Sequence, residues 1–92
     1  MKVQDILTDE SKWTRGSYAR GVSGRTVDYL GKSAVCFCLM GAIMRAASTE
    51  TEQKEMYMAV NLKLNHRGIE GWNDAPERTF AEVRGLIEEL DI

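Results

Sequence analysis

Ser33-Ala-Val-Cys-Phe-Cys-Leu-Met-Gly-Ala-Ile-Met44 is the longest stretch of this sequence without a charged residue. A helix that is apolar on every side is normally either a core helix or a membrane span. Twelve helical residues rise only about 18 Å, whereas the hydrocarbon layer of a bilayer is about 30 Å thick. Lys32 and Arg45 close the two ends of the stretch. We therefore predict a buried central helix over residues 33–47 and no membrane span.

This stretch also carries several small residues on one side of the predicted helix. Gly41 would cost about 1 kcal/mol relative to alanine inside a helix, and close packing can offset that cost. We therefore expect a neighbouring element to approach the helix closely on this side. The small residues are Ala34, Cys38, Gly41, Ala42 and Ala46.

Length and composition predict one ordinary globular domain over residues 1–92. The chain is 43% hydrophobic and 28% charged, which is typical of a folded protein and not of a disordered one. Its net charge of −2 gives no general reason to expect nucleic-acid binding, which usually shows as a basic domain or face. The N-terminal Met-Lys-Val-Gln-Asp lacks the apolar stretch of a signal peptide, so a cytoplasmic protein is expected.

The only cysteines, Cys36 and Cys38, lie inside the apolar stretch. Residues two apart on a helix point about 200° away from each other, so these thiols are poorly placed to pair or to share a metal. With a single histidine, His66, the chain also has too few ligands for a closed zinc site. We expect buried core cysteines, no metal and no cofactor.

Three further helices are predicted around the central one. Residues 2–11 place apolar side chains at helical spacing. A helix ending at Leu64 is expected to begin after Ser48 or Thr49, either of which can cap it. The last helix has the clearest start signal, because Thr79-Phe-Ala-Glu82 fits the capping box.

A glycine-rich segment before the central helix predicts a small β-hairpin. Gly21-Val-Ser-Gly24 suits a turn, which makes residues 17–20 and 25–29 its two strands. A hairpin of this size is marginal alone and must lean on helices. The predicted fold is therefore a mostly helical α+β domain: about four helices around the central apolar helix (33–47), with one short β-hairpin (17–29).

The segment 68–79 concentrates polar side chains and is the first candidate site. In one interpretation its tryptophan stacks on a planar ligand, its other side chains make directional hydrogen bonds, and the following helix N-terminus attracts an anion. In the other, the tryptophan anchors the loop in the core, Asn and Asp bond their own backbone as turn residues do, and Arg78 pairs with a nearby acid. The second is favoured because a loop of this length needs such residues anyway. The candidate residues are Trp72, Asn73, Asp74, Arg78 and Thr79.

A second candidate combines basic and aromatic residues on the predicted hairpin. Such a surface can bind single-stranded nucleic acid by stacking and phosphate pairing. The same residues also suit an ordinary solvated surface, and the negative net charge weakens the nucleic-acid interpretation. The residues are Lys12, Trp13, Arg15, Tyr18, Arg20, Arg25 and Tyr29.

Other sites with a chemical role find little support in the sequence. Glu70, Asp74 and Glu77 could gather as a carboxylate cluster, but their spacing matches no calcium loop. There is no phosphate-cradling glycine loop and no serine nucleophile elbow. No residue is therefore predicted to be catalytic, and an enzyme is the least expected class.

Several motifs resemble a family of small bacterial and phage proteins of unknown function. The resemblance implies an independent small domain of bacterial or phage origin, and it implies no activity, cofactor or partner. It adds interest to residues 72–79, because they carry the most specific motif. The motifs are Trp13-Thr-x-Gly16, Ala19-Arg20, Gly24-Arg-x-Val27, Val35-Cys-x-Cys-Leu-x-Gly-Ala42, Arg45-Ala46 and Trp72-Asn-Asp-Ala-Pro-x-Arg-Thr-x-x-Glu-Val83.

Two functional hypotheses follow. The first is a non-enzymatic accessory protein that acts by protein–protein contact, on a host system that it inhibits or on itself; an exposed apolar patch would support it. The second is a small-ligand or nucleotide-binding module that uses Trp72–Thr79 with Arg15 or Arg20. A concave pocket converging on Trp72 and Arg78 would support the second. Homo-oligomerisation is compatible with so small a core.

Overall fold

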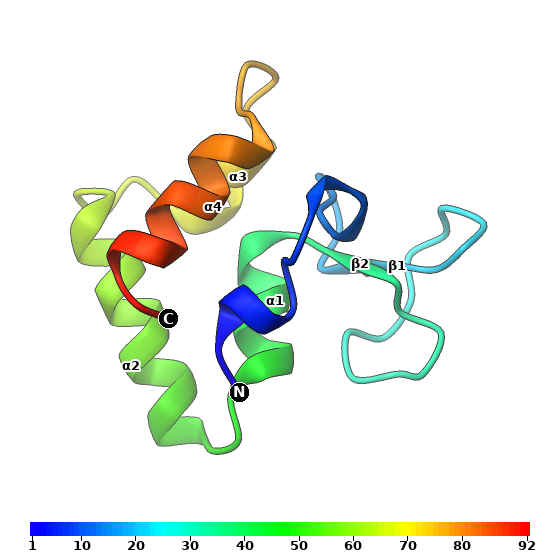
Figure 1. Ribbon diagram of the computed structural model, residues 1–92, viewed down its shortest axis with the longest axis horizontal. Helices are drawn as coiled ribbons and strands as arrows, with labels where there is room; N and C mark the ends of the chain where they lie inside the picture. Colours follow the sequence, from blue (N-terminus) through cyan, green and yellow to red (C-terminus); the bar gives the residue numbers. More distant parts are fainter.

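The central helix of the fold is α1, Leu39–Ala46, in a computed structural model that describes residues 1–92. Most of its side chains are buried, including Leu39 and Ile43, which are fully covered. Helix α1 contacts α2 (Glu50–Lys63) and α3 (Ile69–Asp74). Figure 1 shows helices on one side of the molecule, and the strands and long loops on the other. The mostly helical α+β class is confirmed.

Helix α1 begins six residues later than predicted, because residues 36–38 are extended. Cys38 is the N-cap, with an extended backbone, and its Sγ accepts a hydrogen bond from the Gly41 amide at 3.3 Å. Before it, Cys36–Phe37 form strand β2. The backbone amides of this segment bond across the sheet, with Val35 N donating to Arg20 O at 2.9 Å. The apolar stretch is therefore a strand followed by a helix.

Strand β2 also replaces the predicted partner of the first strand. Strand β1, Ala19–Arg20, pairs antiparallel with β2, with Ala19 opposite Phe37. Both of these side chains are buried, so this pairing covers apolar surface that the predicted 17–29 hairpin would leave exposed. Within residues 17–29 the structure keeps a bridge between Arg20 and Thr26 and the predicted turn, in which Gly24 N donates to Gly21 O.

The predicted first helix, residues 2–11, is wrong in detail. Two separate 3-10 turns take its place, η1 (Val3–Asp5) and η2 (Glu10–Lys12). Asp9 divides them because its Oδ1 accepts a hydrogen bond from the Ser11 amide at 2.9 Å, which starts a new turn.

The helices with capping signals form as predicted. Thr49 caps α2, and Thr79 with Glu82 forms both halves of a capping box at α4, Phe80–Glu89. Between them, the segment predicted as loop 68–79 contains the short helix α3. None of the helices has the length and apolar character needed to span a membrane.

The expected close approach to Gly41 is confirmed, and it fixes the sheet against α1. A Cβ added at Gly41 would lie 1.9 Å from the carbonyl oxygen of Tyr18. The same oxygen accepts a hydrogen bond from the Cys38 amide at 3.2 Å. The backbone of Tyr18 is therefore held directly on the N-terminal turn of α1.

Candidate functional site

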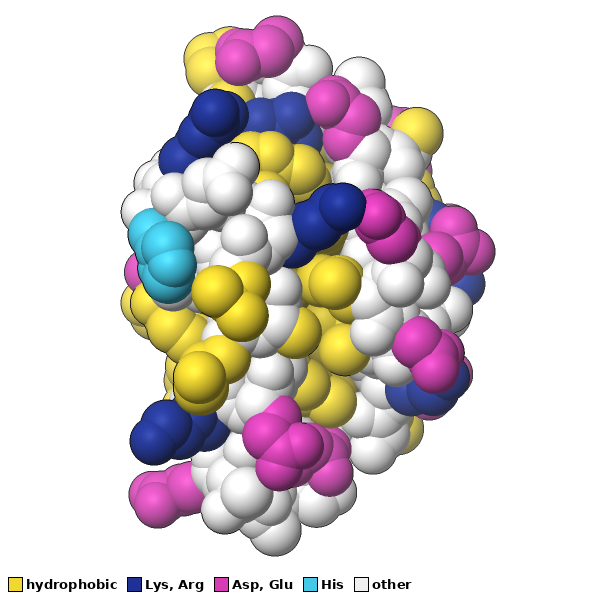
Figure 2. Space-filling model, turned by 90° about the vertical axis from the view of Figure 1, so that its left-hand side faces the viewer, with side chains coloured by type: hydrophobic (Ala, Val, Ile, Leu, Met, Phe, Trp, Pro, Cys, Tyr) yellow, Lys and Arg dark blue, Asp and Glu magenta, His cyan; other side chains and the backbone are white.

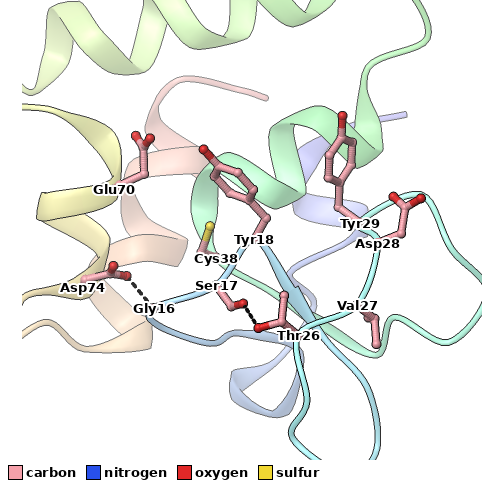
Figure 3. A pocket seen from close by; sticks show the side chains of 10 residues that line it. All are labelled: Gly16, Ser17, Tyr18, Thr26, Val27, Asp28, Tyr29, Cys38, Glu70 and Asp74. Carbon is pink, nitrogen blue, oxygen red and sulfur yellow. Dashed lines mark hydrogen bonds between the residues drawn. The ribbon is translucent and has the colours of Figure 1, made fainter.

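A pocket of about 480 Å³ lies where the residues before β1 meet helix α3. Figure 3 shows its lining, which comes from four parts of the chain. We call it the Tyr18 pocket. Its residues are Gly16, Ser17, Tyr18, Thr26, Val27, Asp28, Tyr29, Cys38, Glu70 and Asp74.

Two tyrosine rings form the aromatic part of the Tyr18 pocket. The rings of Tyr18 and Tyr29 meet edge to face, with centroids 6.4 Å apart and an interplanar angle of 86°. The backbone of Tyr29 is held in place by Arg45, whose Nη1 donates to the Tyr29 carbonyl oxygen at 2.9 Å. Tyr18 remains 44% exposed. A ligand can therefore reach at least one aromatic ring.

Three carboxylates, those of Asp28, Glu70 and Asp74, give the pocket a negative charge. Asp74 is held in place, since its Oδ1 accepts hydrogen bonds from the Gly16 amide at 3.0 Å and from Asn73 Nδ2 at 2.9 Å. Asp28 accepts from the Leu30 amide at 2.9 Å. None of the ion pairs in the protein involves these acids or Glu70, and no basic residue lines the pocket. Their negative charge is therefore not neutralised locally.

This negative charge raises the pKa of the Tyr18 phenol. Its pKa is raised above the ordinary value of 10.0, first by the nearby carboxylate of Glu70 and then by partial burial. Figure 3 shows the hydroxyl end of Tyr18 on the side of the pocket from which Glu70 projects. The hydroxyl is consequently a neutral donor at physiological pH.

The Cys38 thiol lines the same pocket as a neutral group. Burial raises the pKa of Cys38 above its ordinary value of 9.0, so the nucleophilic thiolate is disfavoured. No group of three or more His, Cys, Asp or Glu side chains lies close enough together to hold a metal ion. The arrangement is suited to binding a cation by charge and by aromatic contact.

Of the five candidate ligand-binding residues in segment 68–79, only Asp74 lines this pocket, together with Glu70 from the predicted carboxylate cluster. Asn73 is fully buried and bonds two other parts of the chain as well as its neighbour Asp74. Its Oδ1 accepts from Trp13 Nε1 at 2.7 Å and from the Leu39 amide at 3.0 Å. Its Nδ2 donates to Thr14 O at 3.1 Å and to Asp74. All four hydrogen-bonding positions of the amide are thus used inside the protein.

Trp72, Arg78 and Thr79 also contact neighbouring residues. The Arg78 guanidinium lies 4.1 Å from the centroid of the Trp72 ring, and its Nε donates to Trp72 O at 2.9 Å. Its Nη1 donates to Glu82 at 2.8 Å, which is the pairing with a nearby acid that the structural interpretation expects. Thr79 caps α4. A ligand-binding role for these residues stays a prediction.

The two arginines predicted to assist that loop are bonded inside the protein. Arg15 lies 4.4 Å from the centroid of the Trp13 ring and donates to the carbonyl of Arg78. Arg20 donates through all three guanidinium nitrogens, to Thr14 Oγ1 at 3.1 Å, Gly24 O at 2.9 Å and Arg15 O at 3.0 Å. Two of the four basic side chains in the predicted basic and aromatic surface are therefore already hydrogen-bonded within the protein.

A different surface carries exposed apolar side chains on α2. Met58 and Leu62, one helical turn apart, are 50% and 62% exposed. Figure 2 shows hydrophobic side chains gathered over the middle of the face on which α2 lies. This face offers apolar contact, but it does not indicate the chemistry of a partner.

The sequence grouped only parts of the Tyr18 pocket, Tyr18 with Tyr29 and Glu70 with Asp74, and did not bring the two groups together. Tyr18 and Tyr29 were assigned to the basic and aromatic surface, Glu70 to a carboxylate cluster, and Asp28 to nothing. Their only local signal is residue type. They meet because β1 pairs with β2 and α3 packs against α1, and both contacts are long-range.

The chain belongs to a protein family described as "Family of unknown function (DUF6197)", whose model matches residues 1–90. No curated protein and no solved structure matches the chain. Family membership therefore supplies no activity, and function must be argued from the site.

Proposed function

We propose that this member of the family is a small non-enzymatic binding protein, and that its Tyr18 pocket receives a lysine or arginine side chain of a protein partner. One observation carries the proposal: two tyrosine rings and three carboxylates line one pocket that contains no basic side chain. The pocket thus offers a site for a cation that the chain itself does not fill.

Two physical effects support a cationic ligand. A guanidinium or ammonium group over an aromatic ring gains roughly 0.5–2 kcal/mol, more when it is desolvated. Carboxylates add charge-assisted hydrogen bonds, and a concave, low-dielectric wall focuses their field. Glu70 is an exposed acid on the first turn of α3, so it can reach an incoming cation without breaking an ion pair.

The alternative is a nucleotide or small-ligand module at Trp72–Thr79, and it is less favoured. The guanidinium groups of Arg78 and Arg15 already bond protein acceptors. Using them for a phosphate would require those bonds to be given up. A phosphate would also meet the uncompensated negative charge of Asp74 and Glu70 nearby.

A bacterial or phage source, a cytoplasmic setting and inhibition of a host system complete the proposal. The source rests on the resemblance of the motifs Trp13–Gly16, Val35–Ala42 and Trp72–Val83 to small bacterial and phage proteins. The inhibitory role rests instead on what is typical of small accessory proteins without a catalytic motif, because the resemblance implies no activity. The cytoplasmic setting is compatible with Cys36 and Cys38, which are both free thiols.

Binding of a single charged side chain can be tested by NMR titration. We expect a short glycine–serine peptide with one arginine to shift resonances of Tyr18 and Tyr29, and its citrulline counterpart to shift neither. Glu70→Gln should weaken binding several-fold. Glu77→Gln is the matched control, because Glu77 is exposed and lies outside the pocket, and it should bind as the wild type does.

Two results would contradict the proposal. One is equal binding of the arginine and citrulline peptides, which would remove the role of charge. The other is a set of shifts centred on Trp72 and Arg78, especially with a nucleotide as the titrant, which would favour the alternative site.

A further inference from the structure

A groove of opposite charge adjoins the Tyr18 pocket. It has a volume of about 550 Å³, contains the cations Arg25 and Lys32, and has no acidic residue in its lining. Its apolar part includes Val22 and Val35. Thr26 and Val27 line both this basic groove and the Tyr18 pocket. One short segment thus separates an acidic, aromatic surface from a basic, apolar one.

The loop at the edge of the basic groove is well ordered by hydrogen bonds. Gly21 N donates to Arg25 O and Gly24 N donates to Gly21 O, both at 2.9 Å. Arg20 Nη1 holds Gly24 O at 2.9 Å. Figure 1 shows this loop projecting from the end of the molecule opposite α2. Because the loop is already ordered, presenting its side chains to a partner costs little conformational entropy.

The loop presents one apolar and one cationic side chain. Val22 is 92% exposed, more than any other large hydrophobic residue. The Arg25 side chain is exposed and forms no hydrogen bond or ion pair, unlike five of the other six arginines. Arg25 is therefore free to pair with an acidic site outside its own chain.

We propose that a second copy of this chain is a ligand of the Tyr18 pocket, with Arg25 of one copy entering the pocket of the next. The proposal rests on the proposed function, since it assumes that the pocket takes a basic side chain. The guanidinium would face Asp28, Glu70 and Asp74, and the exposed Val22 would lie against the tyrosine rings. The basic loop and the acidic pocket are complementary in charge, which is why we assign a second copy of the chain to the pocket.

The donor loop and the acceptor pocket are different surfaces of the same chain. Two copies can therefore insert their loops into each other's pockets as a reciprocal dimer, or the contacts can run head to tail and close into a ring or continue as a row. In each arrangement the mass is expected to increase with concentration and to fall when salt screens the charges.

Charge reversal tests the contact by analytical ultracentrifugation. Arg25→Glu and Glu70→Lys should each sediment as a monomer at concentrations where the wild type associates. An equimolar mixture of the two variants should associate again, because the unchanged Arg25 loop of the Glu70→Lys variant then meets the unchanged pocket of the Arg25→Glu variant. Arg67→Glu is the matched control: Arg67 is exposed, lies outside both surfaces, and its reversal should leave association unchanged. Circular dichroism verifies that every variant is folded.

A wild type that stays monomeric at every concentration would overturn self-association, as would equal effects of Arg25→Glu and Arg67→Glu. If the wild type is monomeric and the single-arginine peptide still binds at Tyr18, only self-association fails. If the peptide does not bind and Arg25→Glu leaves association intact, both proposals fail.

Discussion

Asn73 illustrates how a residue that suits a ligand site can instead hold the fold together. Its amide joins Trp13 and Thr14, which precede β1, to the first residue of α1. A buried amide with two acceptor positions and two donor hydrogens, all used, is fixed in orientation and has no capacity left for a ligand. This gives the Trp72-Asn73-Asp74 motif a structural reason to exist.

Asn73→Ala should strongly destabilise the protein. The substitution leaves the Leu39 amide and Trp13 Nε1 without their acceptor, and the cost of unsatisfied buried donors predicts a loss of about 3 kcal/mol. In a domain of this size the melting temperature should fall by more than about 10 °C. Asn61→Ala is the control, because Asn61 bonds only His66 at 2.7 Å near the surface. Similar melting temperatures for the two variants would contradict the structural role.

Glu82 gives the stability a pH dependence. Its pKa is lowered below the ordinary 4.5, first because the Thr79 amide donates to its carboxylate. A carboxylate whose pKa is lower in the folded state stabilises the protein above the unfolded pKa, and that stability is lost as the pH falls through the folded pKa.

Glu82→Gln should remove this part of the pH dependence. Glutamine can accept the same capping hydrogen bond but does not titrate. Between pH 7 and about pH 3, the free energy of unfolding measured with urea should therefore fall less in the variant than in the wild type. Parallel falls in the two proteins would contradict the assignment.

At the scale of elements, the two helices that begin at a capping residue in the sequence, α2 and α4, were predicted correctly. Thr49 and Thr79 cap α2 and α4, and Phe80, Val83 and Ile87 have helical spacing. The stretch before Leu39 had no such signal. An unbroken apolar run has no period, so strand and helix are indistinguishable in it. Cysteine is not among the usual N-cap residues, so no signal in the sequence indicated that α1 begins after Cys38.

The candidate site was less predictable than the helices. The β1–β2 pairing and the position of α3 join residues far apart in the chain, and no pattern within a short window reports on such contacts. The sequence therefore drew attention to the residues that support the pocket, Asn73 among them, more than to Tyr18 and Glu70 in its wall. Asp74 is the only residue of the predicted 72–79 site that lines the pocket, whereas Tyr18, Tyr29 and Glu70 had been assigned to other candidate groups.

Two glycine substitutions test how α1 packs. Gly41→Ala places a methyl group 1.9 Å from Tyr18 O, so strand β1 must move, and overpacking of this kind costs about 1–3 kcal/mol or more. Gly85→Ala in α4 is the matched control, because nothing lies within 4 Å of its added Cβ, and higher helix propensity should stabilise it by up to about 1 kcal/mol. Thermal melts should therefore shift in opposite directions. Equal shifts would show that β1 does not rest on Gly41.

At the scale of the molecule, one core links the two ends of the chain. Val3 and Leu7 are fully buried, and both belong to a continuous apolar cluster that extends to Ile87. Arg84 on α4 donates to Gln4 O at 2.8 Å and to Leu7 O at 3.1 Å. The first residues therefore pack against the last helix, even though they form only 3-10 turns.

The prediction of a single domain can be tested through cooperativity. Trp13 and Trp72 report on the junction between the sheet and α3, while far-UV circular dichroism reports on the helices. If one core holds both parts, fluorescence and circular dichroism should give coincident unfolding transitions. Leu7→Ala removes a fully buried side chain and should cost about 2–5 kcal/mol. Since the core is shared, this substitution should lower both midpoints equally. A shift of the circular dichroism midpoint alone would mean that the strands and loops fold separately from the helices. The wall of the Tyr18 pocket includes Glu70 of α3 and Tyr18 next to β1. The pocket would then be an interface between two folding units.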